Sequence, residues 1–315
     1  GQEGDLYQET ALHTSILTYI NSPGFCGYSP LHVAVLGHSH ELEKIIVTYD
    51  YIMPQFYNQD KAKLDKTSNV ELDKIKKRVK IVHYLVHHDA SVDCRDIDNR
   101  TPLHLTSISG GLDLIPVLLD NGAQIDARDV IDMTPIAYAC KKGDVSITGY
   151  LVQRKCDVTI PNIYGQTALH HTAQHNRVEC LELLVQHHPQ IIDLLDEDRM
   201  SALAVACDLG YSSITKILLD HHADPQLRDK EGQVAIHKAA MHGWDEIVVQ
   251  LIERQVNLDV QDATGSTALH LSITNRKWYT ATLLLEAGCG VNIPNHLGNI
   301  PFQNAVMWNQ SIRIQ

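Results

Sequence analysis

Histidine is the side chain with the greatest potential for metal or proton chemistry here, because the 315 residues contain 19 of them. A zinc site needs about four ligands that converge on one ion. Three adjacent pairs and one cluster are the candidates: His87 with His88, His187 with His188, His221 with His222, and the group His170, His171 and His175. The pairs are far apart in sequence and the cluster does not have the spacing of a metalloprotease helix. We therefore expect no metal site.

Other catalytic chemistry has no clear candidate either. The chain contains neither a GxSxG nucleophile elbow nor a GxxxxGK[ST] phosphate loop. Its carboxylates stand in ordinary turn positions, and its glycines occur at turns and helix ends. We expect no catalytic residue and no cofactor within these residues, although a larger parent protein could carry a catalytic domain.

Six of the histidines belong to a pattern, because they occupy the fourth position of a tetrapeptide: His13, His32, His104, His170, His237 and His270. The pattern is clearest as TPLH from Thr101. It returns as TPIA, TALH, SALA, VAIH, TALH and IPFQ, starting at positions 134, 167, 201, 234, 267 and 300. Successive starts therefore differ by 33, 33, 34, 33, 33 and 33 residues. A fixed period of this length indicates a repeat protein.

Each unit encodes two short helices. Thr or Ser in the first slot is a favourable helix N-cap, and Pro suits the first helical position. In the unit from Thr267, apolar residues over 268–273 predict a first helix and those over 281–285 a second. Gly288 is placed to end the second helix. Two such helices cannot bury a core alone, so neighbouring units must stack.

The period and tetrapeptide resemble the ankyrin repeat over at least residues 96–303. The resemblance implies an all-α solenoid of helix-turn-helix units with short β-turn tips, in about eight to nine repeats including a divergent N-terminal one. It also implies that the fourth-slot histidines form hydrogen bonds within and between units. Partner proteins in this family usually bind a concave groove formed by the turn tips and the first helices.

We expect a single solenoid over residues 1–315, with 1–28 as a truncated or capping unit and 101–315 as regular repeats, the last incomplete. The tetrapeptide from Ser29 precedes that from Thr101 by 72 residues, which is 39 more than one unit of 33. Residues 29–100 are thus divergent: either one repeat carries an insertion, or a second repeat has lost its tetrapeptide. We favour an insertion at about 50–78, because 79–90 has the pattern of a second helix. The extra residue after Thr167 is expected near 189–192.

The insertion ends in a basic run that includes Lys74, Lys76, Lys77, Arg78 and Lys80. Acidic residues are interleaved with it, which favours a solvated helix face. The alternatives are a nuclear-import signal or a surface for an acidic partner.

Composition limits the location and the partners. The chain is 44% hydrophobic with a net charge of −12, no stretch approaches 18 consecutive apolar residues, and no signal peptide is evident. We expect no nucleic-acid binding and no direct membrane contact. Seven cysteines without a CxxC pair, of which Cys140 and Cys207 occupy the slot of a buried alanine, favour a reducing cytoplasmic location. The alternatives are the cytosolic face of a membrane protein or the nucleus. A start at Gly1 suggests a fragment of a larger protein.

We predict a protein-interaction scaffold. The alternatives are the cytoplasmic ankyrin domain of a TRP-type ion channel and the substrate-recruiting arm of a multidomain enzyme such as a ubiquitin ligase. Repeat phase places the following candidate partner-binding residues at the tips and on the first helices: Arg100, Met133, Lys141, Lys142, Tyr164, His175, Glu197, Asp198, Met200, Asp208, Lys230, Glu231, Met241, His242 and Trp308.

One turn is a candidate for modification. Leu284 lies eight residues before Asn292, which follows a valine, and this resembles the turn that an asparaginyl hydroxylase modifies in many ankyrin proteins. The alternative is an asparagine chosen for turn geometry.

Overall fold

The computed structural model describes residues 28–36 and 70–306, with the side chains of 70–77 excepted. These residues form helices joined by turns, and the extended structure among them is a single antiparallel bridge between Leu195 and Ser201. The chain divides into two compact units. Unit 1 comprises Gly1–Ala139 and Gln153–Cys156, and unit 2 comprises Cys140–Val152 and Asp157–Gln315. The predicted all-helical repeat fold is therefore confirmed.

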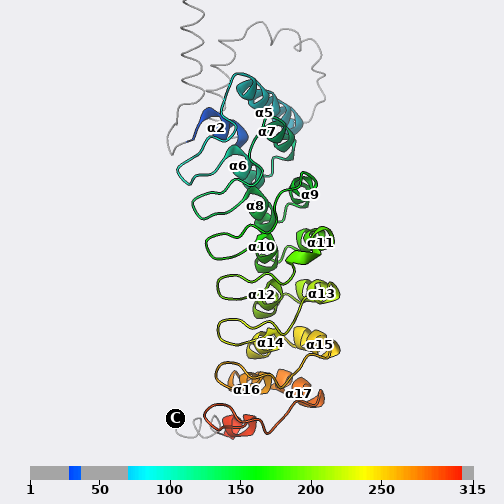
Figure 1. Ribbon diagram of the computed structural model, residues 1–315. Coiled ribbons are helices and arrows are strands. Elements are labelled where there is room, and N and C mark those ends of the chain that lie inside the picture. Colours follow the sequence, from blue (N-terminus) through cyan, green and yellow to red (C-terminus); the bar gives the residue numbers. More distant parts are fainter. Residues whose placement is uncertain (1–27, 37–69, 307–315) are drawn as a thin grey trace, which may run out of the picture. The chain divides into compact units, whose positions relative to one another are not determined.

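Unit 2 contains the most regular repeats. Its inner helices, each of which begins one residue after the first slot of a tetrapeptide, are α10 (Ala168–Gln174), α12 (Ala202–Leu209), α14 (Ala235–His242) and α16 (Ala268–Thr274). Its outer helices are α11 (Val178–His187), α13 (Ser212–Asp220), α15 (Asp245–Glu253) and α17 (Trp278–Glu286). Each inner helix packs on the next inner helix, and each outer helix on the next outer one, so the two sets form separate columns (Figure 1). The turns that precede the inner helices project from the side of the inner column away from the outer helices (Figure 1).

Unit 1 contains the divergent repeats. Its helices are α2 (Pro30–Leu36), α5 (Val70–His87), α6 (Pro102–Ser109), the 3₁₀ helix η3 (Leu112–Leu114) and α7 (Ile115–Asp120). The helix predicted after Ser29 is confirmed as α2, which packs against both α5 and α6. Helix α5 is 18 residues long and begins at Val70. The end of the predicted insertion is thus continuous with the predicted second helix, whereas residues 50–69 and the predicted N-terminal unit up to residue 27 lie outside the described residues.

Four further helical segments complete the description of these residues. Helix α8 (Pro135–Lys142) contains the division between the units, and α9 (Val145–Gln153) follows it. The 3₁₀ helix η4 (Pro189–Ile191) lies where the sequence places its one extra residue. Residues 301–306 are also helical.

The fourth-slot histidines join neighbouring repeats within each unit. In unit 1, the backbone N–H of Thr101 donates to Nδ1 of His104 at 3.1 Å, so Nε2 carries the proton and donates to the carbonyl oxygen of Met133 at 2.9 Å. The same bond between neighbouring repeats recurs at four other histidines, with these carbonyl partners: His32 with Arg100, His170 with Met200, His237 with Ser266, and His270 with Asn299. The predicted hydrogen bonds within and between repeats are confirmed at these five positions. Ala137 and Ala204 replace the histidine in two units.

Aliphatic side chains fill the space between the helices. Leu103, Leu169 and Leu203 occupy the third tetrapeptide slot and are buried. Cys140 and Cys207 are also fully buried, as predicted from their alanine-like slot. Their thiols approach the threonine hydroxyls of the neighbouring outer helices, and burial raises the pKa of Cys207 to about 12. These two cysteines are core residues.

Candidate protein interface

Each turn that precedes an inner helix is a rigid finger closed by an Asp or Asn. In unit 2, Oδ1 of Asn162 accepts the backbone N–H groups of Tyr164 and Gln166 at 3.0 and 2.9 Å. Gly165 adopts a left-handed conformation with φ of 73°, and a Cβ there would lie 2.5 Å from the backbone nitrogen of Glu197. The tip can therefore lie directly against the next finger.

The finger tips are also bonded to one another. The backbone N–H of Glu197 donates to the carbonyl oxygen of Tyr164 at 3.0 Å. Equivalent bonds join the tips that follow in unit 2: Lys230 to Asp198, Ala263 to Glu231, and His296 to Thr264. The backbone at Tyr164 is thus fixed on both sides, while its side chain is 57% exposed. A fixed backbone with an exposed ring is a favourable arrangement for binding.

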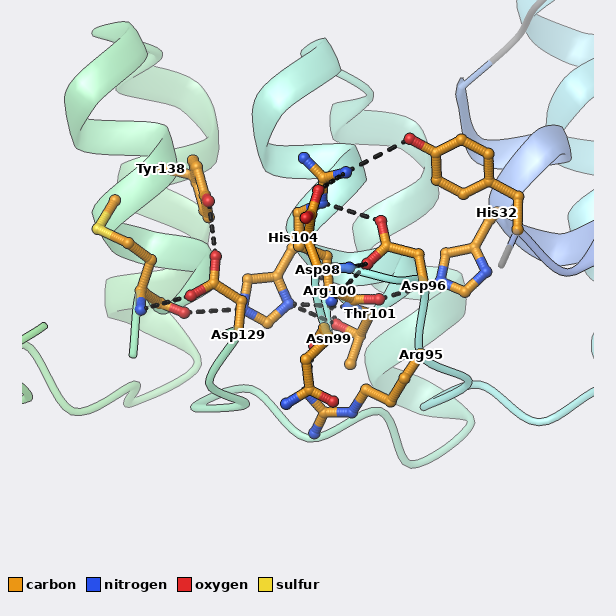
Figure 2. Close-up of polar contacts among 12 residues, drawn as sticks. His32, Arg95, Asp96, Asp98, Asn99, Arg100, Thr101, His104, Asp129 and Tyr138 are labelled. Carbon is orange, nitrogen blue, oxygen red and sulfur yellow. Dashed lines mark hydrogen bonds and ion pairs between the residues drawn. The ribbon is translucent and has the colours of Figure 1, made fainter. Parts of the chain in front are cut away.

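Figure 2 shows the same arrangement in unit 1, where charged side chains of the fingers form ion pairs and hydrogen bonds with one another and with nearby residues. Arg100 forms ion pairs with Asp96 at 2.9 Å and with Asp98 at 2.6 Å. In the next finger, the hydroxyl of Tyr138 donates to Asp129 Oδ2 at 2.6 Å. Of the predicted interface residues, Arg100 is therefore half-buried and already paired.

The prediction that Met133 is an exposed tip residue is wrong. Met133 is only 2% exposed, although its sequence slot, directly before the tetrapeptide, predicts a place in the tip. Its N–H donates to Asp129 Oδ1 at 2.9 Å, and its carbonyl accepts from His104. This residue closes the finger, and its side chain turns inward. Met200 occupies the same slot in unit 2 and is half-buried.

The other predicted interface residues differ in exposure. The exposed ones are Lys141, Lys142, Glu197, Asp198, Lys230, Glu231 and His242. His175, Asp208 and Met241 are half-buried, and Trp308 lies outside the described residues. Within unit 2, Lys230 pairs with Asp198 at 3.1 Å and His242 with Asp208 at 3.3 Å. The structure places these residues on several successive units of the array.

Three exposed aromatic residues were missed by the sequence reasoning. Trp278 and Tyr279, at the start of α17, are 55% and 65% exposed, and Trp244 precedes α15. The indole N–H of Trp244 donates to the carbonyl oxygen of Asp208 at 3.0 Å, and its ring covers Gly210. Trp244 occupies the slot in which earlier units have Tyr211 or Arg177, so comparison of slots was the signal that could have revealed it.

Two buried polar groups directly follow a tetrapeptide: Lys238, which the sequence reasoning missed, and His171, which it considered only as a metal ligand. Lys238 forms a 2.8 Å ion pair with Asp229 in which both side chains are nearly buried. His171 is 4% exposed, and neither of its ring nitrogens has a hydrogen-bond partner. Burial, reinforced by His170, His175 and Lys141, lowers the pKa of His171 to about 3. The imidazole is therefore neutral at physiological pH.

Within residues 28–36 and 78–306, no three His, Cys, Asp or Glu side chains are grouped closely enough to hold a metal ion. In the same part of the chain we find no helix with the length and apolar character required to cross a membrane.

Known proteins resemble this chain in two comparisons. A family model described as ankyrin repeats (3 copies) matches residues 74–162, 136–229 and 205–295. Among solved structures, the ankyrin repeat domain of Bcl-3, described as a unique member of the IkappaB protein family, aligns with a TM-score of 0.61 and 23% sequence identity. The alignment covers 70% of this chain and 99% of that one. No curated protein sequence matches the chain. The tetrapeptide period, the bonded fingers and the family match over most of the sequence show that this chain belongs to the ankyrin-repeat family.

Proposed function

We propose that this chain is a protein-interaction scaffold that binds its partner through the finger tips and the exposed ends of the inner helices. Ankyrin repeats generally mediate protein–protein interaction, and their role is structural rather than catalytic. The observation that carries the proposal is the state of Tyr164 in unit 2. Its backbone is held by Asn162 and Glu197, and its ring is exposed beside the exposed Ile163.

Such a residue is suited to anchor a partner. Binding loses free energy when a flexible loop must be ordered, and a finger whose backbone is already bonded avoids much of that loss. Tyrosine contributes a large apolar area and one hydroxyl group, which is why it is enriched among the residues that dominate binding energy. Charged tips follow directly along unit 2, with Glu197 and Lys230 in the next two fingers. A central apolar anchor with charged neighbours is the usual composition of a protein interface.

Tyr164→Asp should weaken binding to the native partner by at least about 30-fold, the factor that corresponds to losing about 2 kcal/mol at an anchor residue. The unfolding midpoint should change little because the side chain is exposed. Quantitative affinity capture with immobilised wild type and variant, followed by mass spectrometry, would identify the proteins whose retention depends on Tyr164.

Tyr279→Asp is the matched control, because it introduces the same change at an exposed tyrosine of an outer helix. Partners lost with Tyr164→Asp should remain bound to Tyr279→Asp. If the reverse pattern is observed, binding takes place on the outer helices and the proposal is wrong.

Asn292 is proposed as a hydroxylation site of this scaffold. Its side chain is exposed in the turn after α17, where an enzyme can reach it, and Leu284 is buried in the helix before it. Protein isolated from cells that contain an asparaginyl hydroxylase should show one added oxygen on the peptide with Asn292 by mass spectrometry. An unmodified peptide at full coverage would remove the proposal.

A further inference from the structure

Four basic side chains of unit 2 lie together where two successive inner helices end. This cationic patch consists of Lys141 and Lys142, in the last turn of α8, with His175 and Arg177, which follow α10. Arg177 connects the two helix ends, because its Nε donates to the carbonyl oxygen of Lys141 at 3.1 Å. Its side chain also lies against Gly143, where a Cβ would be 2.6 Å from Arg177 Cδ.

The basic groups of the patch have no carboxylate in direct contact, and the nearby Asp144 and Glu179 act with Arg177 on the pKa of Cys180. Among the described residues, no carboxylate oxygen lies within 4.0 Å of its four basic groups. Five basic residues elsewhere in the described chain do have a carboxylate partner: Arg100, Arg154, Lys230, Lys238 and Arg254. An unpaired cluster of one sign is conspicuous in a chain with a net charge of −12.

The residue next to the patch has the same deficit. His171, on α10, is buried without a partner for either ring nitrogen, and its ring centroid lies 6.5 Å from that of His175. The charged or titratable groups that act on it are His170, His175 and Lys141, and no carboxylate is among them. This end of α10 therefore lies beside the positive charge of Lys141 and contains a buried imidazole without a hydrogen-bond partner.

We propose that the cationic patch receives the carboxylate side chains of an acidic segment in the partner protein. Lys and Arg bind carboxylates through charge-assisted hydrogen bonds, which are the strongest class of polar contact available at a surface. The rest of the chain is acidic, so an acidic segment is repelled elsewhere and is directed to this patch. The inference rests on the proposed scaffold function and specifies the chemistry of its partner.

A defined peptide can test the patch without knowledge of the native partner. The probe is a fluorescein-labelled peptide with the repeating sequence Ser-Glu-Glu-Glu, and its counterpart has Gln in place of Glu. By fluorescence anisotropy at low salt, the Glu peptide should bind saturably and the Gln peptide should not. Raising the salt concentration from about 0.05 to 0.3 M should weaken binding, because exposed charges are screened at a shorter distance.

Lys141→Glu/Lys142→Glu should reduce the affinity for the Glu peptide at least tenfold. The matched control is Lys155→Glu/Lys216→Glu, which changes the net charge equally at two exposed lysines outside the patch, and its affinity should stay within twofold of wild type. Equal loss in both variants, or equal binding of the Gln peptide, would overturn the inference. So would binding of inorganic polyphosphate at the patch without binding of the Glu peptide. If the Glu peptide does not bind while Tyr164→Asp still weakens partner binding as predicted, the scaffold function stands and only the acidic segment is wrong.

Discussion

Replacing Lys238 with leucine should lower the free energy of unfolding by about 3–5 kcal/mol, the usual cost of leaving one member of a buried ion pair uncompensated. Asp229 would remain as a buried carboxylate without its 2.8 Å contact. Leucine is a fair test of the slot because Leu105 and Leu271 occupy it in other units. Urea unfolding followed by far-UV circular dichroism would measure the change.

The double variant Asp229→Asn/Lys238→Leu should recover most of that loss. Oδ1 of Asp229 accepts the N–H groups of Glu231 and Gln233, and an asparagine can do the same, as Asn162 does in its own finger. Lys230→Ala is the exposed control: its ion pair with Asp198 is largely in solvent, so its loss should change stability by no more than about 1 kcal/mol. A double variant as unstable as Lys238→Leu would show that packing of the lysine stem, rather than charge, determines the effect.

Acidification should destabilise the protein steeply below about pH 6.5. Burial lowers the pKa of six histidines in the described chain: His32, His104, His170, His171, His237 and His270. The unfolded chain therefore binds more protons than the folded one below the ordinary histidine pKa. Stability is fully present above that value and falls as the pH decreases towards each folded pKa. Urea midpoints should be nearly constant from pH 7.5 to about 6.5 and should decline from there to pH 5.

The contribution of a single histidine to this pH dependence can be measured at His171. With a folded pKa of about 3, it should cost about 2 kcal/mol of stability between pH 7 and pH 5. His171→Leu removes both this titration and an unsatisfied buried polar group, so the variant should be more stable than wild type at pH 7. Its advantage should increase by about 2 kcal/mol at pH 5. An advantage that does not change with pH would show that the imidazole is already charged or solvated in the folded state.

The fold could be predicted because its determinants are local. Thr101 caps its helix through contacts with a residue three positions away, and His104 depends on the same short segment. The inter-unit bond of each histidine then follows from a constant period, since every unit presents a carbonyl at the same place. The extra residue near Pro189 was found for the same reason, because it interrupts an otherwise regular spacing.

The interface was harder to predict because it depends on the direction of each side chain. Met133 and Tyr164 are both apolar finger residues, yet the finger turns the first inward and the second outward. The pair of Lys238 with Asp229 crosses from an inner helix to its finger, and Arg177 meets the carbonyl of a residue 36 positions earlier. Such contacts appear in a sequence only when equivalent slots are compared for charge, which the tetrapeptide alone does not suggest.

The replacement of the fourth-slot histidine by Ala204 has a mechanical consequence. Elsewhere in unit 2, the Nε2 hydrogen bonds of His170, His237 and His270 to the following repeat resist a force applied along the array. Alanine has no polar atom to bond the carbonyl of Gln233, so this junction lacks the interior bond and relies on apolar packing and peripheral contacts such as the tip bond from Lys230 to Asp198. Under tension along unit 2, the repeat of Ser201 and the repeat of Val234 should therefore separate more easily than the repeats that a histidine bond joins.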